Sequence, residues 1–349
     1  MTLPNLATEK MIEFLCGLLN TPSPTGMADA GIAFTEQALA AVPGISMRRT
    51  RKGALVAVIP GQRSDAPRAL TAHCDTLGGM VKEIKPNGRL KLTQIGGFAW
   101  NTVENEGCTI FTASGKTVRG SLLVNTASAH VYRMAVTETK REDANMEVRL
   151  DARTTNGDET RALGIQVGDF VAFDPRVEVV NGFVRSRHLD DKACVACVVA
   201  AVQALADAGL KPVQTTYLHI SNYEEVGHGA SAGIPDEVTE LLTVDMAAVG
   251  DGQTSNEYQT SLCVKDSGGP YHHGLSNRLR QLADEHQIPY VVDVYPFYGS
   301  DGEAFWRAGG DVAVALIGPG VDASHGYERT HTDALEATAR WVMAYLLAE

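Results

Sequence analysis

The sequence predicts a three-layer α/β/α domain that is interrupted by a small β-barrel-like domain. In residues 1–76 and 181–349, apolar strand-like runs alternate with segments of helical periodicity, as in sheets covered by helices. In residues 77–180, short alternating runs are separated by glycine turns and no long helix is apparent. The α/β pattern resumes directly afterwards, so we expect the middle segment to be an insertion into the first domain.

The first domain begins with an amphipathic helix at residues 8–19, in which Met11, Leu15 and Leu18 recur at helical spacing. A turn at TPSPTG and a second helix at residues 28–41 precede two strands, at residues 54–60 and 68–73. Beyond residue 180 we expect helices at residues 191–208, 276–286, 301–308 and 334–347, and strands at residues 215–223, 241–249, 290–297 and 312–318.

The inserted domain is predicted from apolar/polar alternation that is broken by NG, GG, SG and GD. Runs such as MVKEI, RLKLTQI, CTIFTA, SLLVNT and DFVAF have the length and spacing of strands in a small barrel. Residues 135–160 are charged and poor in apolar side chains, so they are expected to include an exposed loop.

Composition excludes several classes of function. The net charge of −12 argues against nucleic acid as a partner, because phosphate binding needs clustered Lys and Arg. No apolar run has the length of a membrane span, and the N-terminus shows no signal-peptide pattern, so the cytoplasm is the expected compartment. Six scattered cysteines form no disulfide framework. For Cys194 and Cys197, two buried residues on one apolar helix is a better interpretation than a redox or zinc pair.

Several metal-ligand or proton-transfer residues follow apolar runs, where a sheet would deliver them into one crevice. In AHCD, His73 is a good ligand for a transition metal, and Asp75 can accept its other ring N–H. The alternative is a hydrogen-bonded histidine at a strand end followed by a turn Asp. In HLDD, Asp190 can bridge two metals with its two oxygens, while Asp190 or Asp191 can instead cap the helix.

Glu224 and Glu225 end an apolar strand, where unpaired charge would be costly to bury. A metal would neutralise one carboxylate, and the other would act as a general base on a water. A solvated acidic loop and a glycosidase pair are the alternatives. Neighbouring strand residues point to opposite faces, which suits a glycosidase poorly.

Asp245 ends the next strand, and His331 precedes the last helix, with His325 as a rival ligand. Two histidines and several carboxylates together predict a hydrolase with two divalent metal ions. Zinc is the expected metal, although cobalt and manganese accept the same ligands.

The order H-x-D, D, EE, D, H resembles the M42 family of metallo-aminopeptidases, which includes glutamyl aminopeptidases and TET-like enzymes. The resemblance extends over nearly the whole chain. It is carried by TPSPTG, TAHCDTLGGMV, IGGFAW, GSLLVNTASAH, LGIQVGDFVAF, SRHLDDKAC, YEEVGHGAS and GSDGEAF. It implies an α/β exopeptidase domain with an inserted β-domain.

The resemblance also implies roles for individual residues. His73 and Asp245 would hold one metal, and Asp190 would bridge it to the other. Glu225 and His331 would hold the second metal. Glu224 would be the general base and Asp75 would orient His73, and the bond between Asp190 and Asp191 would be cis.

The implied activity is removal of N-terminal residues from peptides by a homo-oligomer, from a dimer to a dodecamer, with contacts from the inserted domain. ERTHT departs from the family's RYxHS, and SHGYERTH is more similar to an M42-like subgroup found with synthesis of an acetylated glutamine-dipeptide osmolyte. A related amidohydrolase or deacylase acting on modified small peptides is the alternative. A non-catalytic scaffold would be expected to lack Glu224 or a ligand, and all are present.

Overall fold

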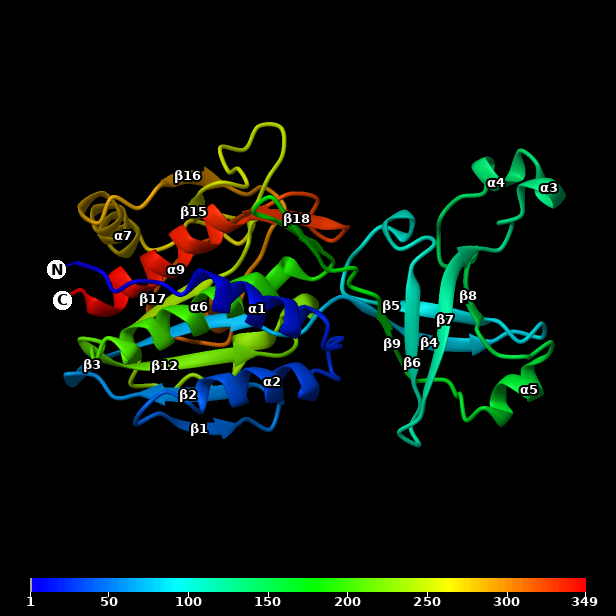
Figure 1. Cartoon of the computed structure of the whole chain (residues 1–349), viewed down its shortest axis with the longest axis horizontal. Coiled ribbons are helices and arrows are strands. Elements are labelled where there is room, and N and C mark those ends of the chain that lie inside the picture. Colours follow the sequence, from blue (N-terminus) through cyan, green and yellow to red (C-terminus); the bar gives the residue numbers. More distant parts are fainter. Residues whose placement is uncertain (1) are drawn as a thin grey trace. The chain divides into compact units, whose positions relative to one another are not determined.

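A computed structural model describes residues 2–349, which divide into two compact units (Figure 1). The larger unit contains residues up to Asp75 and from Arg176 to Glu349. The smaller unit contains Thr76–Pro175. The second unit is therefore an insertion between the end of one strand of the first unit and the segment that re-enters it.

The larger unit is built on a mixed sheet in the order β1-β2-β12-β3-β13-β17-β15-β16, with β14 paired to β17. The strands β12, β3, β13 and β17 are parallel neighbours, so their carboxyl ends meet at one edge of the sheet. The strands are β1 Ser46–Arg49, β2 Leu55–Ile59, β3 Arg63–His73, β12 Gln214–Ser221, β13 Glu240–Val244, β14 Ala247–Ala248, β15 Thr260–Lys265, β16 Tyr290–Val294 and β17 Ala313–Val321.

Alternate residues of the central strands enter two separate cores, which explains the apolar runs. Leu70 of β3 and Leu242 of β13 pack in the larger core, whereas Ala69 and Leu241 pack in the smaller one. A strand whose two faces are both covered lacks apolar/polar alternation and reads as a continuous apolar segment. The continuous apolar runs in the sequence therefore indicate that both faces of the central sheet are covered.

Helices α1, α2, α6, α7 and α9 cover one face of the sheet (Figure 1). The short helix α8 and the turn η3 lie against the other face. Helix α6 is buried along nearly its whole length, including Cys194 and Cys197, whose thiols are free. The helices are α1 Thr8–Leu19, α2 Asp29–Leu39, α6 Leu189–Asp207, α7 His273–Glu285, α8 Asp301–Arg307 and α9 Thr332–Leu347, and η3 is Gly229–Ser231.

A small second sheet has the order β10-β11-β18. Its strands are β10 Glu178–Val180, β11 Phe183–Ser186 and β18 Glu328–His331. Antiparallel pairing of β11 with β18 brings the start of α6 close to the loop that joins β17 to β18.

The inserted unit is a closed barrel in the order β4-β5-β8-β7-β6-β9, in which β4 and β9 close the ring. Its strands are β4 Gly78–Ile84, β5 Leu90–Ile95, β6 Gly107–Phe111, β7 Thr117–Val124, β8 Met146–Leu150 and β9 Phe170–Phe173. Short helical segments η1 Trp100–Thr102, α3 Ala129–Tyr132, α4 Ala135–Glu138 and α5 Gly157–Ala162 join them. The predicted α/β fold with an inserted β-barrel is confirmed. Within residues 2–349, no helix is both long and apolar enough to span a bilayer.

Candidate active site and metal centre

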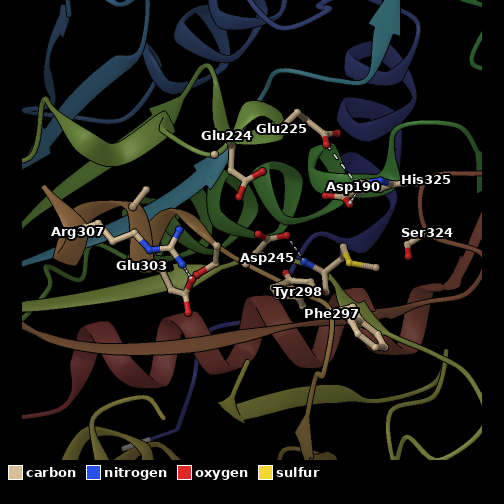
Figure 2. A pocket seen from close by; sticks show the side chains of 15 residues that line it. Asp190, Glu224, Glu225, Asp245, Phe297, Tyr298, Glu303, Arg307, Ser324 and His325 are labelled. Atoms are coloured by element: carbon tan, nitrogen blue, oxygen red, sulfur yellow. Dashed lines mark hydrogen bonds and ion pairs between the residues drawn. The ribbon is translucent and has the colours of Figure 1, made fainter. Parts of the chain in front are cut away.

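A pocket of about 390 Å³ opens at the carboxyl edge of the parallel strands (Figure 2). Acids predicted from the sequence line it together with a wall from the segment that ends in α8. Its lining residues are Asp190, Glu224, Glu225, Gly227, Asp245, Met246, Phe297, Tyr298, Gly299, Ser300, Glu303, Ala304, Arg307, Ser324 and His325.

His73, the last residue of β3, is buried and presents one ring nitrogen for binding. Its Nδ1 lies 2.9 Å from the main-chain carbonyl oxygen of Asp75. A carbonyl oxygen only accepts, so Nδ1 carries a proton, and Nε2 is the ring nitrogen that faces the carboxylates. That Nε2 lies 3.1 Å from Asp190 Oδ1 and 3.6 Å from Glu224 Oε2. Burial opposes the charge of His73, but neighbouring carboxylates raise its pKa, so a metal bound at Nε2 would displace a proton from that nitrogen.

Asp190 lies between two imidazoles. Its Oδ1 faces His73, while its Oδ2 lies 3.3 Å from Nε2 of His325. The peptide bond between Asp190 and Asp191 is cis, as the resemblance predicted. Asp191 does not enter the pocket lining, and its Oδ2 accepts the main-chain N–H of His73 at 3.1 Å.

The ligand atoms fall into two groups that share Asp190. Nε2 or carboxylate atoms of His73, Asp190 and Asp245 lie within 4.8 Å of one another, as do those of Asp190, Glu225 and His325. Figure 2 shows Asp190, Glu225 and His325 turned toward one another. Nitrogen and carboxylate donors at these separations fit zinc and related divalent ions.

His331 does not join either group, which corrects the choice made from the sequence. Its Nδ1 accepts the main-chain N–H of Asp333 at 3.2 Å and so caps α9. Its ring packs against Phe183, with centroids 4.9 Å apart, and a Cβ on Gly182 would lie 2.4 Å from its Nε2. His325 occupies the position at the pocket that had been expected for His331.

The carboxylate of Asp75 contacts a different partner from the one predicted. Its Oδ1 is 3.8 Å from His73 Nδ1, which is too far for a hydrogen bond. Instead, Oδ1 of Asp75 accepts the main-chain N–H of Glu224 at 3.2 Å. Its Oδ2 accepts the main-chain N–H of Glu225 at 3.3 Å and the hydroxyl of Thr25 at 2.6 Å. Asp75 therefore orients His73 through its carbonyl and the two glutamates through its carboxylate.

Glu224 and Glu225 lie in a 3₁₀ turn, η2 (Glu224–Val226), after β12 has ended at Ser221. From the sequence, both residues were expected at the end of a strand, with side chains on opposite faces. The turn removes that alternation, and both side chains line the same pocket. Tyr223 and Gly227 flank the turn in the left-handed conformation, at φ 79° and 85°.

Burial raises the pKa of the carboxyl groups of Glu224 and Glu225, and neighbouring carboxylates add to the effect. Burial and the charge of Asp190 raise the pKa of Asp245 to about 7. Burial also opposes ionisation of Asp190, but hydrogen bonds from His325 and His73 overcome it and lower its pKa. Divalent cations would compete with protons for the same lone pairs, so metal binding would release protons.

Lys52 and Asp301 hold the segment that follows the acidic turn. The ammonium of Lys52 donates to the carbonyls of His228 and Gly229 and to the hydroxyl of Ser231. Asp301, at the start of α8, accepts the N–H of Ala230 at 2.7 Å and the hydroxyls of Ser221 and Thr71. These contacts join η3 to the ends of β3 and β12.

Most of the wall opposite the ligands was not predicted from the sequence. Glu303 and Arg307 of α8 form an ion pair at 2.8 Å on the side of the pocket away from His325 (Figure 2). Phe297 and Tyr298 precede this helix and complete the wall. The GSDGEAF motif pointed to this segment, but the pattern contained no signal for which side chains face the pocket.

Comparison with known proteins identifies the class of protein that this fold and pocket define. The chain belongs to the M42 glutamyl aminopeptidase family, whose model matches residues 53–341. It is 47% identical over 341 residues to the Bacillus subtilis protein named "Putative aminopeptidase YhfE", covering 97% of this chain and 98% of that protein. It is 27% identical to the glutamyl aminopeptidase of Lactococcus lactis over 265 residues, or 73% and 72% of the two chains. The predicted family and the predicted hydrolase class are confirmed.

Solved structures show the same fold. A TET aminopeptidase from the archaeon Thaumarchaeota archaeon SCGC AB-539-E09 superposes with a TM-score of 0.87 at 18% identity, covering 97% of this chain and 96% of that one. The Pyrococcus horikoshii TET1 peptidase, described as assembling into a tetrahedron or a large octahedral shell, gives a TM-score of 0.85 at 19% identity, covering 97% and 100%.

The contacts beneath the pocket predict a pH dependence of stability. His219 of β12 is fully buried, its Nδ1 lies 3.1 Å from the hydroxyl of Thr71, and burial lowers its pKa to about 4 from 6.5. Between these values the unfolded chain binds the proton that the folded chain excludes. Stability is therefore present above pH 6.5 and is lost as the pH falls toward 4, by about 3 kcal/mol for this group. Chemical denaturation of His219→Gln at a series of pH values is expected to show a shallower loss than the wild type.

The same substitution at His273, an exposed residue of α7, is the control and is expected to follow the wild-type curve. Equal acid slopes for His219→Gln and wild type would show that His219 does not contribute.

Proposed function

We propose that this protein is an aminopeptidase that uses two divalent metal ions to hydrolyse the first peptide bond of peptide substrates. The observation that carries the proposal is the position of Asp190, whose two carboxylate oxygens face His73 and His325 separately. A carboxylate shared in this way is suited to bridging two cations. The family match and the relatives named as aminopeptidases support the peptidase activity.

His73 and Asp245 would hold one ion, and Glu225 and His325 would hold the other. Asp190 would contribute to both positions. The donor set fits zinc, and cobalt or manganese are alternatives. When bound, the ions supply positive charge that polarises the scissile carbonyl and lowers the pKa of the attacking water.

Glu224 is the proposed general base. Its carboxylate lines the pocket with Oε2 3.6 Å from Nε2 of His73, yet it belongs to neither ligand group, so its oxygens stay available to a proton. It takes the proton from the attacking water and transfers it to the nitrogen of the leaving amine. The Asp75 carboxylate holds the Glu224 main-chain N–H and thereby fixes the base relative to His73.

The free amino group of a peptide is a cation, and the carboxylates of the pocket provide the complementary charge. A blocked N-terminus lacks that charge, which is the basis for expecting an exopeptidase. We also propose a cytoplasmic location. It is supported by the free thiols of Cys16, Cys74, Cys108, Cys194, Cys197 and Cys263, which are typical of reducing compartments.

The test of the proposed function is metal content measured together with hydrolysis of free and N-acetylated peptides, before and after chelation. The expected result is two equivalents of metal per chain and release of N-terminal residues from free peptides, which is lost on chelation and restored by zinc or cobalt. Chelator-insensitive hydrolysis would exclude the metal mechanism. Cleavage of acetylated peptides alone would show an amidohydrolase instead.

Replacement of Glu224 by Gln is expected to lower kcat by about 10²–10⁴-fold while both metals remain bound, because the base is lost and the ligands are not. Glu225→Gln is the matched comparison, because it removes a ligand charge and is expected to lower metal content. Metal analysis and steady-state kinetics on the two variants separate these roles. Wild-type kcat in Glu224→Gln would contradict the assignment of the base.

We further propose that the inserted unit mediates assembly into a homo-oligomer. The segment that contains α3 and α4 exposes Val131 by 70%, Met134 by 64% and Tyr132 by 45%, which is unusual for apolar side chains so close together. The structural relative from Pyrococcus horikoshii is described as forming large shells, which supports a second copy of the chain as the partner.

The double substitution Val131→Glu and Met134→Glu is expected to yield a smaller species in size-exclusion chromatography with light scattering, because charge on this surface opposes its burial. Val167→Glu, on the same unit and 65% exposed, is the control and is expected to leave the mass unchanged. An unchanged mass for the double variant would exclude this surface as the contact.

A further inference from the structure

We propose that Glu328 is a positioning residue that sets the distance between Asp190 and His325, and so builds the second metal position. The inference rests on the proposed function. Glu328 begins β18, is 2% exposed and has no place in the pocket lining. Its Oε2 accepts the main-chain N–H of Asp190 at 3.0 Å, and its Oε1 accepts that of His325 at 2.9 Å.

His325 occupies a segment whose conformation needs support. His325 lies in the loop between β17 and β18, where it has φ 61° and Ala323 has φ 58°. Side chains disfavour this left-handed region, which glycine usually occupies. A hydrogen bond from Gly326 N–H to the Ala323 carbonyl closes the turn at 2.9 Å, and Glu328 holds the N–H of His325.

The segment before Asp190 is tied to the same loop a second time. The guanidinium of Arg187 donates to the carbonyl of Gly326 at 3.1 Å. With the two bonds of Glu328, this makes a link between the start of α6 and the β17–β18 loop. The side chains of Asp190 and His325 then meet at 3.3 Å on the pocket side of that link.

The chemistry at this position requires a carboxylate. Two N–H donors converge on Glu328, and its two oxygens accept one each. Glutamine has the same shape, but its NH₂ group would face one of the N–H donors and leave it buried without an acceptor. Aspartate keeps both oxygens but is shorter by one methylene. Either substitution is expected to loosen the distance between Asp190 and His325 without removing any metal ligand.

Glu257 provides a matched control on the other side of β18. Its Oε1 and Oε2 accept the Nε–H and Nη2–H groups of Arg329 at 2.6 and 2.8 Å, and it is 9% exposed. Its main-chain carbonyl also accepts the N–H of His331 at 3.2 Å. These hydrogen bonds with β18 therefore involve neither Asp190 nor His325. Glu257→Gln makes the same change in charge and shape as Glu328→Gln.

The experiment is titration of the metal-free full-length protein with Co²⁺, followed by visible absorption and by calorimetry. Wild type is expected to show two binding steps. Glu328→Gln is expected to weaken one step by about tenfold or more, the range found when partners of metal ligands are removed, and to leave the other within about twofold. Glu257→Gln is expected to match the wild type. Circular dichroism on each metal-free protein reports whether the fold is kept.

The variant His325→Ala identifies which step is affected. It should weaken the same step as Glu328→Gln, and the double variant should lose less than the product of the two single effects, because both act on one position. If Glu328→Gln does not fold, Glu328→Asp is titrated in its place. Two wild-type steps in a folded Glu328 variant would overturn the positioning role. Fewer than two steps in the wild type would instead overturn the two-metal function.

Discussion

The concentration of carboxylates at one edge of the sheet is the constraint on which the rest of the site depends. A buried charge without a partner costs several kcal/mol, so each carboxylate needs donors or a cation. Some have protein donors: Asp75 accepts two main-chain N–H groups, Asp191 accepts one, and Asp301 accepts one together with two hydroxyls. The carboxylates at positions 190, 224, 225 and 245 line the pocket, where Asp190 lies beside His73 and His325 and Asp245 accepts the main-chain N–H of Met246. The protein therefore separates the acids that build the site from those that meet a ligand.

The acids that accept main-chain N–H groups, such as Asp75 and Asp191, also connect strand ends to one another. Asp75 follows β3 and holds the turn after β12, and Asp191 begins α6 and holds the last residue of β3. The N–H of Cys74 donates to the Ser221 carbonyl at 3.1 Å, so β3 and β12 remain paired up to the pocket. Because these bonds involve main-chain groups, the separations between ligands are set by the backbone rather than by flexible side chains. This is the preorganisation that a polar site needs.

Much of this arrangement was predictable because it follows from the central strands. Apolar runs on β3, β12 and β13 are long and end abruptly at His73, near Glu224 and at Asp245, so the sequence indicates both the strands and their shared edge. The choice between His325 and His331 was not predictable in this way. Both belong to SHGYERTH, and only the left-handed turn at residues 323–325 decides which imidazole reaches the pocket. The partner of the Asp75 carboxylate and the 3₁₀ turn at Glu224 depend likewise on local backbone geometry.

The two sides of the pocket are under different constraints, which bears on how one family accommodates different substrates. The ligand side is fixed by strand ends that also form the core, so its residues cannot shift without disturbing the sheet. The opposite side comes from residues 297–307, where Phe297 is 96% exposed and Arg307 contacts the pocket from α8. The ion pair of this wall, between Arg307 and Glu303, lies within α8 itself. Substitutions there change the shape and charge of the pocket while His73, Asp190 and Asp245 keep their places. This wall is therefore where the preference for the substrate's side chain can differ between proteins that share the same ligand residues.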